Sequence, residues 1–165
     1  MIHYEDNARE YLLEYLNKSP KKFALPGGKG TVLSKFKKDK SGESIYIIDD
    51  DGDEIADEEI LESIERDSSF SNINDVKLFK DKKANEKYLV IFNIDFPTWL
   101  ISALNQIGKQ PSEYGFQNQK GKFHKQIREK ELKENFKKLL IDMNKENSQM
   151  LQVLKNIFIK INHKA

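Results

Sequence analysis

Carboxylates gather directly after one short apolar run of this chain. The run 45–48 is β-branched and aromatic, which is typical of a buried strand. Four aspartates follow it at once: Asp49, Asp50, Asp51 and Asp53. Such a cluster at the end of a buried strand is electrostatically unfavourable unless a cation lies among the carboxylates. Because hard oxygen ligands suit Mg²⁺ or Mn²⁺, the first hypothesis is a metal site at this strand end.

Two other segments that could do chemistry also follow predicted strands. Glu5 comes after the short apolar start 1–4, and the loop 27–30 (Gly-Gly-Lys-Gly) comes after the predicted strand 22–25. Glycine lets backbone N–H groups approach a phosphate before a helix N-terminus, and the lysine adds a cationic contact. In a parallel sheet the carboxyl ends of strands lie on one edge, so the topology would bring these segments to the aspartates.

The rest of the sequence predicts the elements that position these groups. Apolar residues at helical spacing predict helices over 7–16, 31–38, 56–66 and 97–107, and a largely helical stretch over 123–161. Further strands are expected at 76–79 and 87–94, joined by a lysine-rich turn, while 108–121 is loop-like. The alternation of strands and helices predicts an α/β fold with a mostly parallel sheet flanked by helices. We expect an α/β domain over 1–107 and a loop with a helical C-terminal extension over 108–165.

Composition narrows the classes of protein. The 165 residues suffice for one domain with a real core, or for one domain and a helical extension. Net charge is near +1, so nucleic-acid binding would depend on local basic patches. The absence of cysteine excludes disulfides, cysteine-ligated zinc and thiol catalysis. No apolar run has the length of a membrane span and no leader pattern opens the chain, so we expect a cytoplasmic protein without membrane contact.

The order of these segments resembles the TOPRIM domain, which is shared by bacterial primases, topoisomerases, the ribosomal-RNA maturase family and OLD-type nucleases. The resemblance covers roughly residues 1–95. It rests on Glu5 in H-Y-E-D-N, on the glycines in P-G-G-K-G, and on Asp49 with Asp51 in I-I-D-D-D-G-D. The apolar run before the aspartates fits the same pattern.

The stretch 95–100 (D-F-P-T-W-L) resembles the aromatic-rich helix that follows the TOPRIM core in RloB-like phage-defence proteins. In those proteins an acidic residue usually stands between the phenylalanine and the tryptophan. Here Pro97 and Thr98 occupy that interval.

The resemblance implies a Mg²⁺- or Mn²⁺-dependent nuclease that cleaves nucleic-acid phosphodiester bonds, DNA or RNA, in phage defence or a mobile element. The implied catalytic residues are Glu5, Asp49 and Asp51, and the implied metal ligands are Glu5, Asp49, Asp51 and Asp53. The implied phosphate-binding residues are Gly27, Gly28, Lys29 and Gly30. The fourth aspartate, Asp50, would point away from the site and be dispensable.

Three alternatives stay open. In a haloacid-dehalogenase-like phosphatase, Asp49 would be the nucleophile and Asp51 the acid/base, although Asp53 stands where that motif has threonine or valine. A receiver domain would use Glu5 and Asp6 as its paired acids. A non-catalytic subunit would keep the TOPRIM-like scaffold for binding.

Several features bear on partners. Lysines cluster at 35–40, 80–87 and 120–125 and could form basic surfaces around the acidic centre, although solvated helix and turn surfaces look the same. His124 in one of these clusters could face a phosphate. The apolar density of 150–161 is high for a chain end. These helices could simply pack onto the sheet, and the alternative is a protein partner or a homodimer through the C-terminal helices.

Overall fold

The computed structural model describes residues 1–16, 23–50, 55–68, 75–84 and 86–163, without the side chains of 162 and 163. Its five-stranded sheet has the order β1–β2–β5–β4–β3. The strands are β1 (Ile2–His3), β2 (Ile45–Asp49), β3 (Ile64–Arg66), β4 (Val76–Asp81) and β5 (Tyr88–Phe92).

The sheet is mixed, so the expectation of a mostly parallel sheet is wrong. β1, β2 and β5 pair in parallel, whereas β4 is antiparallel to both of its neighbours, β5 and β3. The physical reason is the short connection 82–87 between β4 and β5. A parallel neighbour needs a crossover of about a dozen residues or more, and only a hairpin fits this length.

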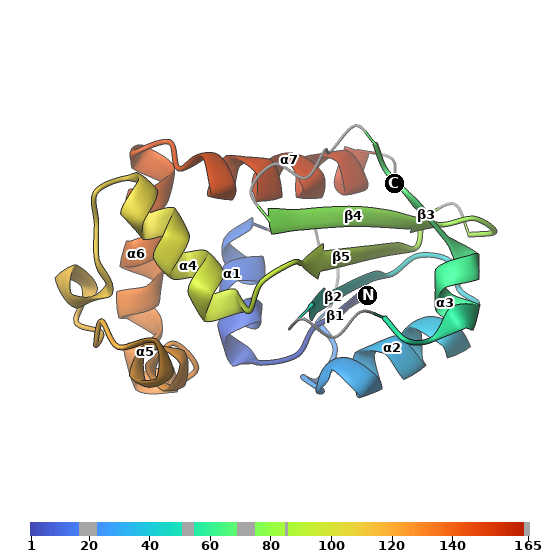
Figure 1. Ribbon diagram of the computed structural model, residues 1–165, viewed down its shortest axis with the longest axis horizontal. Coiled ribbons are helices and arrows are strands. Elements are labelled where there is room, and N and C mark those ends of the chain that lie inside the picture. Colours follow the sequence, from blue (N-terminus) through green and yellow to red (C-terminus); the bar gives the residue numbers. More distant parts are fainter. Residues whose placement is uncertain (17–22, 51–54, 69–74, 85, 164–165) are drawn as a thin grey trace.

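Helices cover both faces of this sheet (Figure 1). They are α1 (Asn7–Leu16), α2 (Lys29–Lys38), α3 (Glu58–Ser63), α4 (Phe96–Gln106), α5 (Lys120–Gln126), α6 (Lys133–Lys145) and α7 (Gln149–His163). Short 3₁₀ turns lie at Pro111–Tyr114 and Lys130–Leu132. The α/β class with helices on the sheet and a helical C-terminal segment is therefore confirmed.

Alternation along β2 divides the core in two. Ile45 and Ile47 pack in the larger cluster, which also contains residues of α1, α4, α6 and α7. Tyr46 and Ile48 pack in the smaller cluster with residues of α2 and α3. The first side chain after Ile48, that of Asp49, therefore faces the larger cluster, which decides its surroundings.

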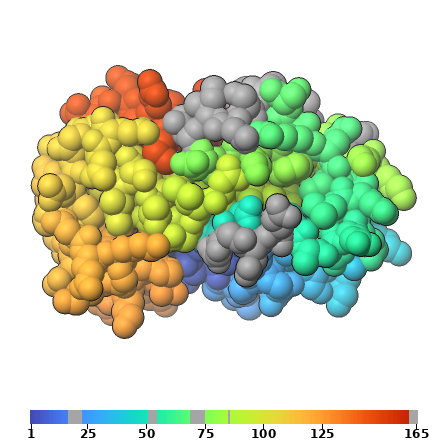
Figure 2. Space-filling view, in the orientation of Figure 1, coloured from blue at the N-terminus to red at the C-terminus, as the bar shows by residue number. Residues whose placement is uncertain are grey.

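The larger cluster joins residues from both sides of position 107. Phe92 and Trp99 belong to it, and so do Phe136 of α6 and Phe158 of α7. Figure 2 shows the orange segment packed directly against the yellow part of the chain that precedes it. Most apolar side chains of 150–161 lie inside this core, whereas Ile159 is half exposed.

Three segments differ from what the sequence predicts. The predicted helix 56–66 ends at Ser63, because the residues after it pair antiparallel with β4 instead. Of the predicted strand 22–25, Phe23 forms a single bridge to Ile2, while position 22 lies outside the described residues. The predicted loop 108–121 contains one 3₁₀ turn and the first residues of α5.

Within the described residues, every helix is too short or too polar to cross a membrane.

Candidate functional site at the carboxyl edge of the sheet

Parallel strands β1, β2 and β5 end at the same edge, and their arrowheads point toward α1 and α4 (Figure 1). The helices α1 and α4 begin just beyond this edge, at Asn7 and Phe96. The loop before α2 reaches the edge as well, because the N–H of Gly27 donates to the carbonyl of Tyr4 at 3.1 Å. Chemistry in open α/β sheets is usually located at this position.

Glu5 and Asp49 meet at this edge, as the sequence predicts. The Oε1 atom of Glu5 accepts a hydrogen bond from the backbone N–H of Asp49 at 2.7 Å. The two residues are far apart in the chain, and the parallel pairing of β1 with β2 brings them together. This bond fixes the glutamate against the end of β2.

The carboxylate of Asp49 is bound on its inner side. Asp49 is 4% exposed, and its Oδ2 atom accepts a hydrogen bond from the N–H of Phe96 at 2.9 Å. The same oxygen pairs with the guanidinium of Arg9. Asp49 therefore links β2 to the first turns of α1 and α4.

Arg9 lies at the centre of this cluster, although no sequence motif includes it. Its guanidinium also pairs with Asp6 at 2.8 Å and stacks over the ring of Phe96, 5.1 Å from the centroid. Burial lowers the pKa of Arg9, but the carboxylates of Asp49 and Asp6 outweigh it, so the net shift is upward. A permanent positive charge therefore lies against Asp49. The only sequence signal was an arginine on the apolar side of a predicted amphipathic helix.

A second charged pair lies at the start of α4. Asp95 caps this helix by accepting from the N–H of Thr98 at 3.1 Å, and it pairs with Lys120 at 2.8 Å. Partial burial raises the pKa of Asp95, but the bonds from Lys120 and Thr98 hold it below its usual value. The sequence signal for Asp95 was an acidic residue two positions before the proline of a helix start.

His124 of α5 lies beside these charges. Its Nε2 atom is 3.9 Å from the carboxylate of Asp6. Burial and the positive charge of Arg128 lower the pKa of His124, so its imidazole is neutral at pH 7. The imidazole of His124 therefore faces the carboxylate of Asp6 in this structure.

The predicted phosphate loop forms the entry to α2. Gly28 is the N-cap of α2 and offers no side-chain cap to the first turn of this helix. Around Gly28 and Gly30 there is open space, whereas a Cβ at Gly27 would come within 2.9 Å of the Thr31 side chain. Gly27 is therefore needed for packing, and Gly28 and Gly30 leave room for a ligand.

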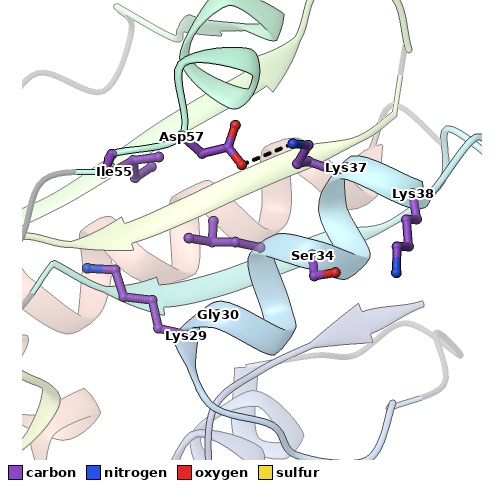
Figure 3. A pocket seen from close by; sticks show the side chains of 9 residues that line it. Lys29, Gly30, Ser34, Lys37, Lys38, Ile55 and Asp57 are labelled. Carbon is purple, nitrogen blue, oxygen red and sulfur yellow. Dashed lines mark hydrogen bonds and ion pairs between the residues drawn. The ribbon is translucent and has the colours of Figure 1, made fainter.

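A groove of about 590 Å³ runs from this loop along α2 (Figure 3). It is lined by Lys29, Gly30, Leu33, Ser34, Lys37, Lys38, Ile55, Ala56 and Asp57. Lys37 and Asp57 face each other across it with 3.1 Å between Nζ and Oδ2. The remaining lysines make the α2 wall of the groove basic.

The first residues past the ends of β2 and β5 each carry a side-chain oxygen that is buried without a hydrogen-bond donor: Oδ1 of Asp50 and Oδ1 of Asn93. Asp50 follows β2 and Asn93 follows β5, and the register pairs Asp49 with Phe92, the residue before each. The two orphaned oxygens therefore belong to neighbouring positions of adjacent parallel strands.

The structure describes only some of the predicted metal ligands. Asp51 and Asp53 lie outside the described residues. Among the residues that the structure does describe, no three acidic or histidine side chains form a group that could hold a metal ion. Glu5 and Asp49 are together, but they do not complete a coordination shell on their own.

Comparisons of this chain with protein-family models, with curated proteins and with solved structures find no match.

Proposed function

We propose that this chain is a metal-dependent nuclease that cleaves nucleic-acid phosphodiester bonds at the carboxyl edge of its sheet. The observation that carries the proposal is the meeting of Glu5 with Asp49 across β1 and β2, with a hydrogen bond of 2.7 Å. Two acidic residues from separate strands at this edge are what a phosphoryl-transfer centre needs. The setting in phage defence or a mobile element follows from the TOPRIM resemblance alone.

The oxygen ligands that are available at this edge suit a hard divalent cation. Carboxylate and amide oxygens gather there, and those of Asp50 and Asn93 are buried without a donor. Glu5 and Asp49, with Asp51 and Asp53 from the sequence, are the residues that would hold Mg²⁺ or Mn²⁺. When bound, the ion would polarise a phosphoryl oxygen and lower the pKa of a water molecule.

The residues of the chain position the reacting groups. The N–H of Asp49 holds Glu5 at the edge, while Arg9 and the N–H of Phe96 hold Asp49. The uncapped first turn of α2 and Lys29 would bind a phosphate, because helix N-termini and lysines favour anions. The basic wall of the groove would then bind the neighbouring phosphates of the nucleic-acid strand.

A second candidate is a non-catalytic, TOPRIM-like subunit that binds nucleic acid. The observation that favours it is the ion pair between Arg9 and Asp49, because the arginine already neutralises the carboxylate that a metal would need. The same pair argues against the phosphatase alternative. A nucleophilic Asp49 must reach its substrate, and this side chain is buried and held on its inner side.

The test is incubation of the purified chain with single- and double-stranded DNA and RNA in Mg²⁺ or Mn²⁺, with a chelator as control. If the chain is the proposed nuclease, Glu5→Ala and Asp49→Ala should each abolish cleavage. Circular dichroism checks that both variants are folded. Loss with Asp49→Ala alone would indicate the phosphatase chemistry. If the parent chain binds nucleic acid without cleaving it, the result would support the non-catalytic subunit.

A further inference from the structure

Strand alternation assigns the side chains of Asp50 and Asn93 to the α2 side of the sheet edge. Asp49 and Phe92 face the larger core, where they contact Arg9 and Phe96 respectively. Because side chains alternate along a strand, the next residue of each strand faces the other side. The backbone supports this continuation, since the N–H of Asp50 donates to the carbonyl of Phe92 at 2.6 Å.

Buried acceptors without donors are uncommon in native proteins, because each loses its hydration without a replacement. Here two of them occupy neighbouring positions on adjacent strands, which lie about 4.8 Å apart in a sheet. In the part of the chain that the structure describes, no lysine, arginine or N–H group donates to either oxygen. One positively charged species between them would satisfy both at once.

We propose that Asp50 and Asn93 hold a hard divalent cation, one through a carboxylate oxygen and the other through an amide oxygen. Carboxylate and Asn carbonyl oxygens are both ligands of such ions. This proposal rests on the proposed metal-dependent function and changes its ligand set. Asp49 anchors α1 and α4 through Arg9 and Phe96, and Asp50, which the sequence suggested was dispensable, becomes a ligand.

A rotated amide is the competing explanation. Turning the Asn93 side chain would replace its oxygen with an NH₂ group, which could donate to Asp50 without any ion. The two explanations predict opposite effects of a second carboxylate. Asn93→Asp adds a charged ligand to a cation site, whereas in a rotated amide it places two carboxylates in contact.

The experiment measures Mn²⁺ binding by electron paramagnetic resonance in the absence of nucleic acid. Three variants are compared with the parent chain: Asp50→Asn, Asn93→Asp, and Glu65→Gln on exposed β3 as control. We expect Asp50→Asn to weaken Mn²⁺ binding about tenfold or more, Asn93→Asp to tighten it, and the control to match the parent. Thermal unfolding with and without Mn²⁺ checks that each variant folds and should show the same order of stabilisation.

Parent-like binding by Asp50→Asn, or weaker binding by Asn93→Asp, would overturn the proposal. Because binding is measured without substrate, this result is separate from that of the cleavage assay. Cleavage that survives Asp50→Asn would contradict the ligand assignment and leave the nuclease intact. Mn²⁺ binding that depends on Asp50 in a chain that cleaves nothing would contradict the nuclease and leave the cation site.

Discussion

Arg9 and Asp49 form a buried ion pair at the point where α1, β2 and α4 meet. The pair is completed by Asp6 on one side and by the N–H of Phe96 on the other. Three elements that are distant in the chain are therefore fixed by one charged contact. The same contact holds the end of β2, whose next residues carry the remaining aspartates.

Arg9→Met should destabilise the fold strongly. The substitution puts a shorter, unbranched apolar side chain in place of the guanidinium and leaves Asp49 buried without its cation, and removal of one partner from a buried pair costs about 3–5 kcal/mol. The free energy of unfolding, measured by urea denaturation, should fall by about that amount. Arg128→Met on the exposed surface is the matched control. A loss below about 1 kcal/mol for Arg9→Met would mean that the pair contributes little.

Local patterns predicted the parts of the fold that local forces determine. The run 45–48 is a strand and 7–16 is a helix, because each buries its apolar residues within its own periodicity. Residues 64–66 follow a helical spacing too, yet they pair with β4. That pairing depends on the hairpin beside it, and no window of the sequence contains this information.

The candidate site was predicted in the same uneven way. Glu5 and Asp49 were found because strand order alone brings strand ends together. Arg9 was missed because an arginine in the first turn of a helix is usually solvated, and its burial depends on two other elements. Alternation predicts that Asp50 faces the other side of the sheet from Asp49, but it could not show that an oxygen of Asp50 is buried without a donor.

Low pH should destabilise the folded protein, in part because the carboxylate of Asp39 becomes protonated. Its carboxylate accepts from the N–H and the hydroxyl of Ser41 at 2.8 and 2.6 Å and from the hydroxyl of Tyr46 at 2.8 Å. Partial burial raises the pKa of Asp39, but these bonds outweigh it and hold the pKa well below its usual value. A depressed pKa stabilises the folded state above the unfolded value of about 3.9, and this contribution disappears as pH falls further.

The free energy of unfolding of the parent chain should therefore decrease between about pH 4 and pH 2. Asp39→Asn should show a smaller decrease over that interval, because an amide does not titrate. Glu129→Gln, at an exposed position, should follow the parent curve. Identical curves for the parent chain and for Asp39→Asn would show that Asp39 does not contribute.

Gly115→Ala should destabilise the turn before α5. Gly115 has φ of 82°, and a Cβ there would lie 2.8 Å from the side-chain nitrogen of Asn135. That nitrogen donates to the carbonyl of Tyr114 at 2.8 Å, so it cannot move without breaking the bond. We expect a loss above about 1 kcal/mol in urea denaturation. Gly121→Ala is the control, since Gly121 lies in α5 with open space around it. This substitution should leave the free energy of unfolding unchanged or raise it.

The basic wall of α2 should determine how binding to nucleic acid depends on salt. Lys29 and Lys38 both line the groove, and each phosphate contact releases counterions when it forms. For single-stranded DNA, Lys29→Gln should weaken binding and reduce the slope of log K against log salt by about 0.7. Lys145→Gln at the end of α6 provides a control of equal charge change far along the chain. Equal slopes for these two variants would mean that binding follows net charge alone, and the groove along α2 would then not be the path of the strand.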